Sequence, residues 1–144
     1  MLDLSNNRIR DEDNQYLVAT LRTYRHLKHL RPGTNVITDV GAEHLARFLL
    51  ENGQLKLLEL FSNELTSPGV ITFAQTVLHS RLYYFSIGGN QQVNDECIDA
   101  IIVMIRRQSK YLKAISLVDI DFSQKSKEKL RHMIKSKHLS FLCI

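Results

Sequence analysis

The sequence predicts an α/β solenoid in which short parallel strands stack on one side and helices stack on the other. One apolar template, L-x-x-L-x-L-x-x-N-x-L, recurs along the 144 residues, and its first positions fall at Leu27, Leu55, Leu82, Leu112 and Leu139. A helical spacing of apolar residues follows each copy, as in Leu45, Ala46 and Leu49. A fixed period of this length is the signature of a repeat architecture with one strand and one helix per unit.

The template assigns every repeat in order. Its apolar and Asn positions are Leu2, Leu4, Asn7 and Ile9; Leu27, Leu30, Asn35 and Ile37; Leu55, Leu58, Leu60, Asn63 and Leu65; Leu82, Phe85, Ile87, Asn90 and Val93; Leu112, Ile115, Leu117, Ile120 and Phe122; and Leu139, Leu142 and Ile144. We therefore expect a single domain over 1-144, with about five repeats at 1-26, 27-54, 55-81, 82-111 and 112-138 and a partial repeat at 139-144.

Three repeats depart from the template. Pro32 occupies a strand position and has no N–H for the ladder, so pairing should weaken on one side. The fourth repeat carries one extra residue around Gln91 and Gln92, which should bulge its loop. Ile120 replaces the Asn of the fifth repeat, whose turn must close in another way.

The remaining asparagines are predicted to be structural. Their short amides can satisfy backbone groups of a turn inside the stack, where an unpaired group costs about 1–3 kcal/mol. This Asn ladder comprises Asn7, Asn35, Asn63 and Asn90.

The segment Ile37-Thr38-Asp39-Val40-Gly41-Ala42-Glu43-His44-Leu45 resembles the strand-to-helix passage of the leucine-rich-repeat family, in its ribonuclease-inhibitor-like class of long repeats. The resemblance covers essentially the whole chain. It implies a right-handed horseshoe with parallel strands on the concave side and helices on the convex side. It also implies a module that binds another protein, and that inhibits or regulates this partner if the partner is an enzyme.

In such a horseshoe, alternate strand positions face outward on the concave sheet. Outward apolar and aromatic residues gather in the third and fourth repeats at Leu57, Phe61, Tyr83 and Tyr84. Solvent-facing strand positions have no structural need for such side chains, so these residues indicate a binding surface. The predicted partner-binding residues are these four together with His29, Arg31, Lys56, Glu59, Val118 and Asp119. For Leu57 and Tyr83, the alternative is that they fold over the rim of the sheet and cover the core.

Catalytic and ligand-binding motifs are not found. The six histidines show no metal spacing, and Cys97 and Cys143 have no neighbouring partners, so we expect free thiols, no metal, no cofactor and no catalytic residues. No apolar run approaches the roughly 20 residues of a membrane span, and the first residues do not resemble a signal peptide. The expected protein is cytoplasmic and not an enzyme, and it binds neither membrane nor a small-molecule substrate.

The charge is uneven, and much of the positive excess lies between Lys125 and Lys137. This segment could bind phosphates, but its charges spread around a helix and no aromatic residues interleave. A solvated helix face is favoured over nucleic-acid binding.

Two other functions remain open from the sequence. Some long-repeat proteins of the family activate small GTPases through an arginine near an early strand end, and Arg8, Arg10 and Arg31 are loosely placed for that role. The chain begins and ends within the template, which also fits an interaction arm of a larger receptor. Short, irregular repeats resemble those of effectors that intracellular bacteria deliver into the host cytosol.

Overall fold

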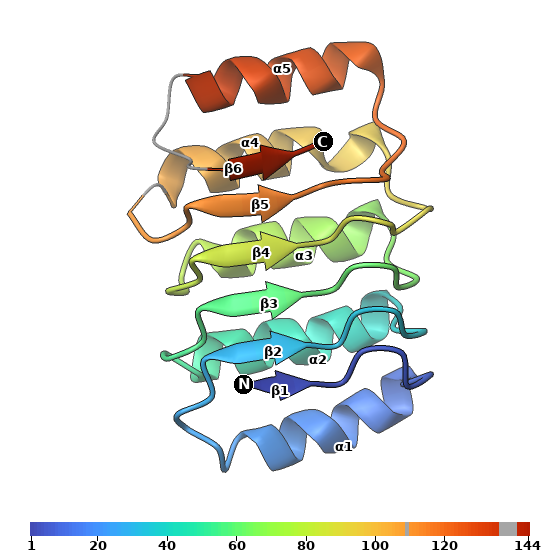
Figure 1. Ribbon diagram of the computed structural model, residues 1–144, viewed down its shortest axis with the longest axis vertical. Coiled ribbons are helices and arrows are strands. Elements are labelled where there is room, and N and C mark those ends of the chain that lie inside the picture. The colour runs from blue at the N-terminus through green and yellow to red at the C-terminus, as the bar shows by residue number, and fades with distance from the viewer. Residues whose placement is uncertain (109, 136–140) are drawn as a thin grey trace.

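Six short parallel strands form one sheet in the order of the sequence, β1-β2-β3-β4-β5-β6 (Figure 1). The computed structural model describes residues 1–108, 110–135 and 141–144. The strands are β1 (Leu2–Asp3), β2 (His29–Arg31), β3 (Leu57–Glu59), β4 (Tyr84–Ser86), β5 (Ala114–Ser116) and β6 (Phe141–Cys143). The helices are α1 (Asp11–Leu21), α2 (Asp39–Glu51), α3 (Ser67–Val77), α4 (Ile98–Arg107) and α5 (Gln124–Lys135), with a 3₁₀ turn η1 (Asp95–Cys97) before α4.

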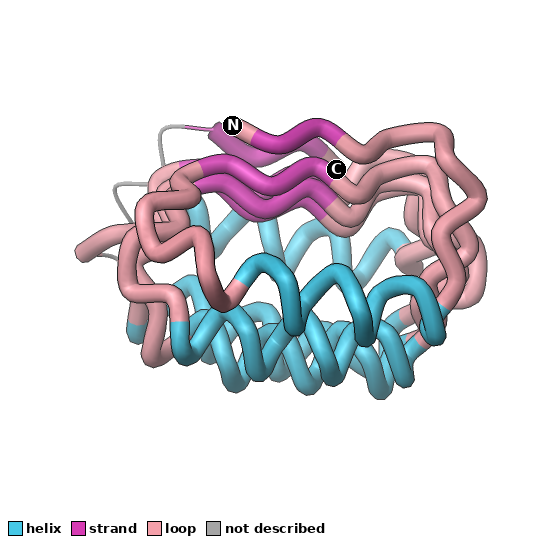
Figure 2. Tube along the Cα trace, turned by 90° about the horizontal axis from the view of Figure 1, so that it is seen from below, coloured by secondary structure: helices cyan, strands magenta, loops and turns pink. Residues whose placement is uncertain are grey.

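Strands and helices form two layers joined by loops at both sides, as Figure 2 shows. The predicted leucine-rich-repeat solenoid, with a parallel sheet on one side and helices on the other, is confirmed. No described helix is long and apolar enough to cross a membrane.

The core lies between the two layers and runs without a break from repeat to repeat. Leu30, Leu58, Phe85 and Ile115 are in register across β2 to β5, and each is at most 1% exposed. The ring of Phe85 also meets Phe73 of α3, with ring centroids 5.5 Å apart. A strand this short cannot hide its apolar face alone, so stacking of neighbouring repeats holds the fold together.

The side chains of Asn35, Asn63 and Asn90 each join their turn to the preceding one, whereas the Asn7 side chain bonds within its own turn. Asn90 is fully buried, and its Oδ1 accepts hydrogen bonds from the N–H groups of Asn63 (3.2 Å) and Leu65 (3.0 Å) in the preceding repeat. Its Nδ2 donates to the carbonyls of Leu60 and Ile87 at 3.0 and 2.7 Å. Asn35 makes the equivalent contacts with Asn7 N–H, Ile9 N–H and Leu4 O.

The ladder stops where the fifth repeat has Ile120. Val93 occupies the position that Leu65 has in the preceding repeat. The Leu65 N–H donates to the Asn90 side chain of the next repeat, whereas the Val93 N–H donates to Asn90 O within its own repeat. The fifth turn is closed locally by a hydrogen bond from Phe122 N–H to Ile120 O at 2.9 Å. The extra residue of the fourth repeat is taken up in an exposed loop at Gln91 and Gln92, after which η1 precedes α4.

A second ladder, not foreseen from the sequence, joins the beginnings of successive helices. Asp11 accepts hydrogen bonds from Thr38 N–H (2.9 Å) and Thr38 Oγ1 (2.6 Å), and Asp39 accepts from the same two groups of Thr66. Asp95 accepts from Ser123 N–H at 2.9 Å. The first turn of one helix therefore fixes the N-cap of the next, and a Cβ on Gly69 would overlap the Asp39 carboxylate.

Candidate protein-binding surface

The solvent side of the sheet carries the residues predicted to bind a partner. His29, Leu57 and Tyr84 form one row across β2, β3 and β4, because His29 pairs with Leu57 and Leu57 with Tyr84. All three are half-buried. The parallel register thus brings side chains that are up to 55 residues apart in the sequence into one row across three successive strands.

Tyr83 and Lys56 lie at the beginnings of β4 and β3. Tyr83 N–H donates to Lys56 O at 2.8 Å, so the two residues are neighbours, and Tyr83 is 54% exposed. Tyr83 is therefore not folded away over the core.

Phe61 follows β3 and lies against the next repeat. A Cβ on Gly88 would lie 3.2 Å from the Phe61 ring, and a Cβ on Gly89 would lie 3.1 Å from it. These two glycines therefore leave the space into which the ring packs, and 37% of Phe61 remains exposed. This packing of Phe61 on two glycines was not predicted from the sequence, although Gly-Gly at template positions seven and eight was a usable signal.

A charged row crosses the sheet beside these apolar residues. Arg31 Nε is 3.1 Å from Glu59 Oε2, and Asp3 is the register partner of Arg31. The Arg31–Glu59 contact is an ion pair rather than a well-aligned hydrogen bond, since Arg31 Nε has no hydrogen-bond partner of good geometry. Hydrogen bonding by Ser5, and to a smaller extent the Arg31 charge, lowers the pKa of Asp3.

The last two predicted residues lie further along the sheet. Val118 is half-buried, and its carbonyl accepts from Gly89 N–H at 2.8 Å, so it lies beside the glycines on which Phe61 packs. Asp119 is exposed in the following turn with a φ of 57°. Ser86 and Ala114 are only 3% and 8% exposed, and Ala114 is the register partner of the larger Tyr84.

Exposed apolar side chains also occur on the helices, but they are scattered. Tyr16 lies on α1, Val40 and Leu50 lie near opposite ends of α2, and Val103 lies on α4. Single exposed apolar residues are ordinary, whereas a contiguous group marks an interaction surface. On the sheet side, Leu57 and Tyr84 are register partners, Tyr83 directly precedes Tyr84, and Phe61 lies beyond Glu59 at the end of β3; we call these four residues the sheet patch.

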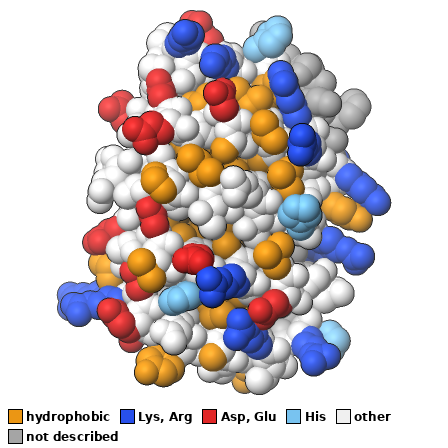
Figure 3. Space-filling model, turned by 180° about the vertical axis from the view of Figure 1, so that it is seen from behind, with side chains coloured by type: hydrophobic (Ala, Val, Ile, Leu, Met, Phe, Trp, Pro, Cys, Tyr) orange, Lys and Arg blue, Asp and Glu red, His pale blue; other side chains and the backbone are white. Residues whose placement is uncertain are grey.

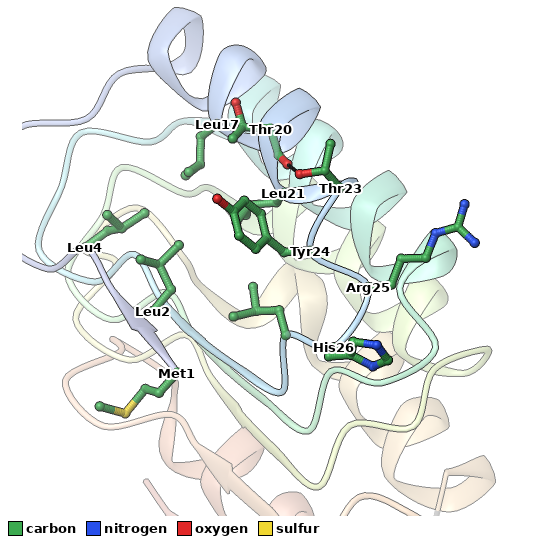
Figure 4. Close-up of a pocket in the computed structure, with 11 residues that line it drawn as sticks. Met1, Leu2, Leu4, Leu17, Thr20, Leu21, Thr23, Tyr24, Arg25 and His26 are labelled. Atoms are coloured by element: carbon green, nitrogen blue, oxygen red, sulfur yellow. Dashed lines mark hydrogen bonds between the residues drawn. The ribbon is translucent and has the colours of Figure 1, made fainter.

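A cavity of about 820 Å³ opens beside β1 (Figure 4). Leu2 of β1 and Leu4, which follows the strand, point toward Leu17 of α1 and toward Tyr24, whereas Arg25 points away. The cavity contains none of the predicted binding residues. It is the apolar side of the first described repeat, where β1 forms the edge of the sheet.

No grouping suited to catalysis or metal binding was found in the described residues. Groups of three or more His, Cys, Asp or Glu side chains that could hold a metal ion do not occur there. Burial raises the pKa of the Cys97 thiol to about 11, which is opposite to the shift of a reactive cysteine. Arg31 is held by Glu59, whereas Arg8 and Arg10 are exposed in the loop before α1.

Comparison with known proteins supports the repeat assignment. A family model described as Leucine Rich repeat matches residues 54–74. The solved structure of leiomodin-1 actin-binding site 2 is similar to this chain, with a TM-score of 0.68, 13% sequence identity, and coverage of 93% of this chain and 78% of that one. A search of curated proteins gave no match. The fold is that of a leucine-rich-repeat solenoid.

Proposed function

We propose that this protein is an interaction module that binds a folded partner protein through the concave, strand-lined side of the solenoid. The sheet patch carries the proposal, because it places exposed aromatic and aliphatic side chains of two neighbouring repeats beside a charged row. Aromatic anchors surrounded by polar residues are the usual anatomy of a protein-binding hot spot. The similar fold of leiomodin-1, which is described as an actin-binding site, supports a protein as the ligand.

The repeat spacing of 27 to 30 residues, with a helix in each of the five repeats, supports the ribonuclease-inhibitor-like class of long repeats. Inhibition of a partner enzyme is the extension of the proposal that this resemblance suggests. It is tested by adding the protein to the activity assay of the identified partner. A cytoplasmic location fits the two free cysteines, since disulfides are rare in that compartment.

The experiment identifies the partner and tests the surface together. A photo-crosslinking amino acid placed at Tyr83 should capture the partner, while the same group placed at Tyr16 on the helix side should not. The affinity of the purified partner is then measured by calorimetry for alanine variants of each sheet-patch residue. We expect at least one of Phe61→Ala and Tyr84→Ala to cost more than about 2 kcal/mol of binding free energy.

Tyr16→Ala is the matched control, because it removes an exposed aromatic side chain from α1 and should leave the affinity within about twofold. Circular dichroism shows whether each variant remains folded. Unchanged binding in all four sheet-patch variants would remove the concave-face proposal.

A further inference from the structure

The two long sides of the solenoid carry opposite charge. In the space-filling view, Lys and Arg gather mainly along the side where the helices end, and Asp and Glu along the side where they begin (Figure 3). We define the basic rim as the last turns of α1 to α4 with the described loop residues that lead into β2 to β5, residues 18–28, 48–56, 74–83, 104–108 and 110–113. It carries nine Lys and Arg residues and a single carboxylate, Glu51.

The opposite side is the acidic rim, formed by the loops after the strands and the first turns of the following helices, residues 4–14, 32–42, 60–70, 87–101 and 117–127. It carries ten carboxylates and four Lys and Arg residues. The fold explains this charge. Asp11, Asp39 and Asp95 hold the N-cap of the next repeat, and acidic side chains in a first turn favour the helix dipole.

The fold does not explain the basic rim in the same way. The last turns of α1, α2 and α3 contain no basic residue, so most of the cations lie in loops beyond the reach of the helix dipole. Glu51 is occupied by Arg22, whose Nε and Nη2 donate to it at 2.7 and 3.0 Å. Within the described part of the chain, no ion pair joins a carboxylate to Arg25, Lys28, Lys56, Arg81, Arg106, Arg107 or Lys110.

Three of these cations converge around one phenol. Lys110 Nζ lies 5.0 Å from the centroid of the Tyr111 ring. Hydrogen bonding and charge from Lys110 lower the pKa of Tyr111, and the charges of Arg81 and Lys56 lower it further. Residues of two successive repeats therefore contribute to one positive field on the protein surface.

This positive cluster is continuous with the sheet patch. Lys56 immediately precedes Leu57, and Tyr83 N–H donates to Lys56 O. An apolar centre with a charged margin is the composition of a protein interface. A polypeptide can supply both an acidic segment for the positive cluster and apolar side chains for the sheet patch, and is therefore favoured over a nucleic acid.

Building on the proposed concave-face function, we infer that the basic rim, centred on Lys56, Arg81 and Lys110, binds an acidic polypeptide segment of the partner protein. The segment lies along the rim while apolar side chains of the partner occupy the sheet patch. Long-range attraction between the rim and carboxylates speeds association and orients the partner.

The first test uses a fluorescein-labelled, glutamate-rich peptide of about 16 residues, and measures its binding to the whole chain by fluorescence anisotropy at about 50 and 200 mM salt. The triple variant Lys56→Gln, Arg81→Gln, Lys110→Gln should weaken binding about tenfold or more. The matched control, Lys125→Gln, Lys129→Gln, Arg131→Gln, has the same net charge but changes exposed residues of α5, and should weaken binding less than about twofold.

The inference would be overturned if the peptide did not bind at low salt. It would also be overturned if both triple variants weakened binding equally, because the loss of affinity would then follow from the net charge and not from the position of the rim. A single-stranded oligonucleotide of equal charge that binds more tightly than the peptide, and loses affinity in the rim variant, would assign the surface to nucleic acid instead. Tyr16→Ala, which changes an exposed residue of α1 outside both rims, should leave peptide binding unchanged. A crosslinked partner that responds to Phe61→Ala but not to the rim variant would retain the proposed function and refute this inference alone.

Discussion

At the scale of single residues, glycine and asparagine control how closely the repeats stack. Gly88 allows the backbone of Val118 and the ring of Phe61 to approach from opposite neighbours, and a Cβ there would lie 2.5 Å from Val118 O. Gly53, in contrast, has no atom within 4 Å of the Cβ it would carry. The same residue type thus has a packing role in one loop and none in another.

Gly88→Ala should therefore lower the free energy of unfolding by about 1–3 kcal/mol, because the added methyl group forces the neighbouring repeat and the Phe61 ring apart. Gly53→Ala is the control and should change it by less than about 0.5 kcal/mol, or increase it slightly by restricting the unfolded chain. Both are measured from denaturant midpoints at constant m-value. Equal effects of the two substitutions would show that the contacts at Gly88 carry no energetic weight.

At the scale of elements, each helix is fastened to the next one at its first turn. Asp39 is the first residue of α2 and accepts from two groups of Thr66, which caps α3. Asp99 lies in the first turn of α4 but is highly exposed, with a 3.9 Å contact to Lys129. Asp39 and Asp99 therefore have similar positions relative to the helix dipole. They differ in their contacts with the next repeat, since Asp39 accepts hydrogen bonds from Thr66 and Asp99 only contacts Lys129.

We expect Asp39→Ala to cost about 1–2 kcal/mol of unfolding free energy, since it leaves the N-cap of α3 without its partner. Asp99→Ala should cost less than about 0.5 kcal/mol, in line with other exposed ion pairs. Thermal and chemical denaturation measure both. If the two losses prove similar, the contribution of Asp39 comes from the helix dipole and not from the link between repeats.

At the scale of the whole molecule, the solenoid has a protected middle and an exposed first repeat. Leu2 and Leu4 are half-buried beside the cavity next to β1, whereas Leu58 and Phe85 are each 1% exposed. Because each repeat contacts only its neighbours, local stability depends on the number of neighbours that a repeat has.

Native-state hydrogen exchange should therefore show a gradient. The amide of Leu60, which donates to Ser86 O in the middle of the sheet, should exchange at least about 100-fold more slowly than the amide of Leu4, which donates to Arg31 O at the β1 edge. Both rates are first corrected for the intrinsic exchange rate of each residue. Equal protection at the two sites would mean that the whole chain opens as one unit.

The sequence predicted the architecture because the repeat is a local and periodic property. The position of each core leucine follows from the template, and the register of β2 to β5 matches it at Leu30, Leu58, Phe85 and Ile115. It also indicated which strand positions face solvent, with Ser86 and Ala114, at 3% and 8% exposed, as exceptions. It did not predict the helix-to-helix ladder, since the link between Asp39 and Thr66 is visible only when two repeats are stacked.

The recurring template therefore determined that this chain is a solenoid with one strand and one helix per repeat, because units that repeat at a fixed long period bury their apolar faces against their neighbours. The tertiary structure decided what the surface contains. It set Phe61 on the glycines of the next repeat, placed Leu57 beside Tyr84, and gathered Lys56, Arg81 and Lys110 around Tyr111. Each of these three sets combines residues of two neighbouring repeats. They come together only because the repeats stack with their strands side by side.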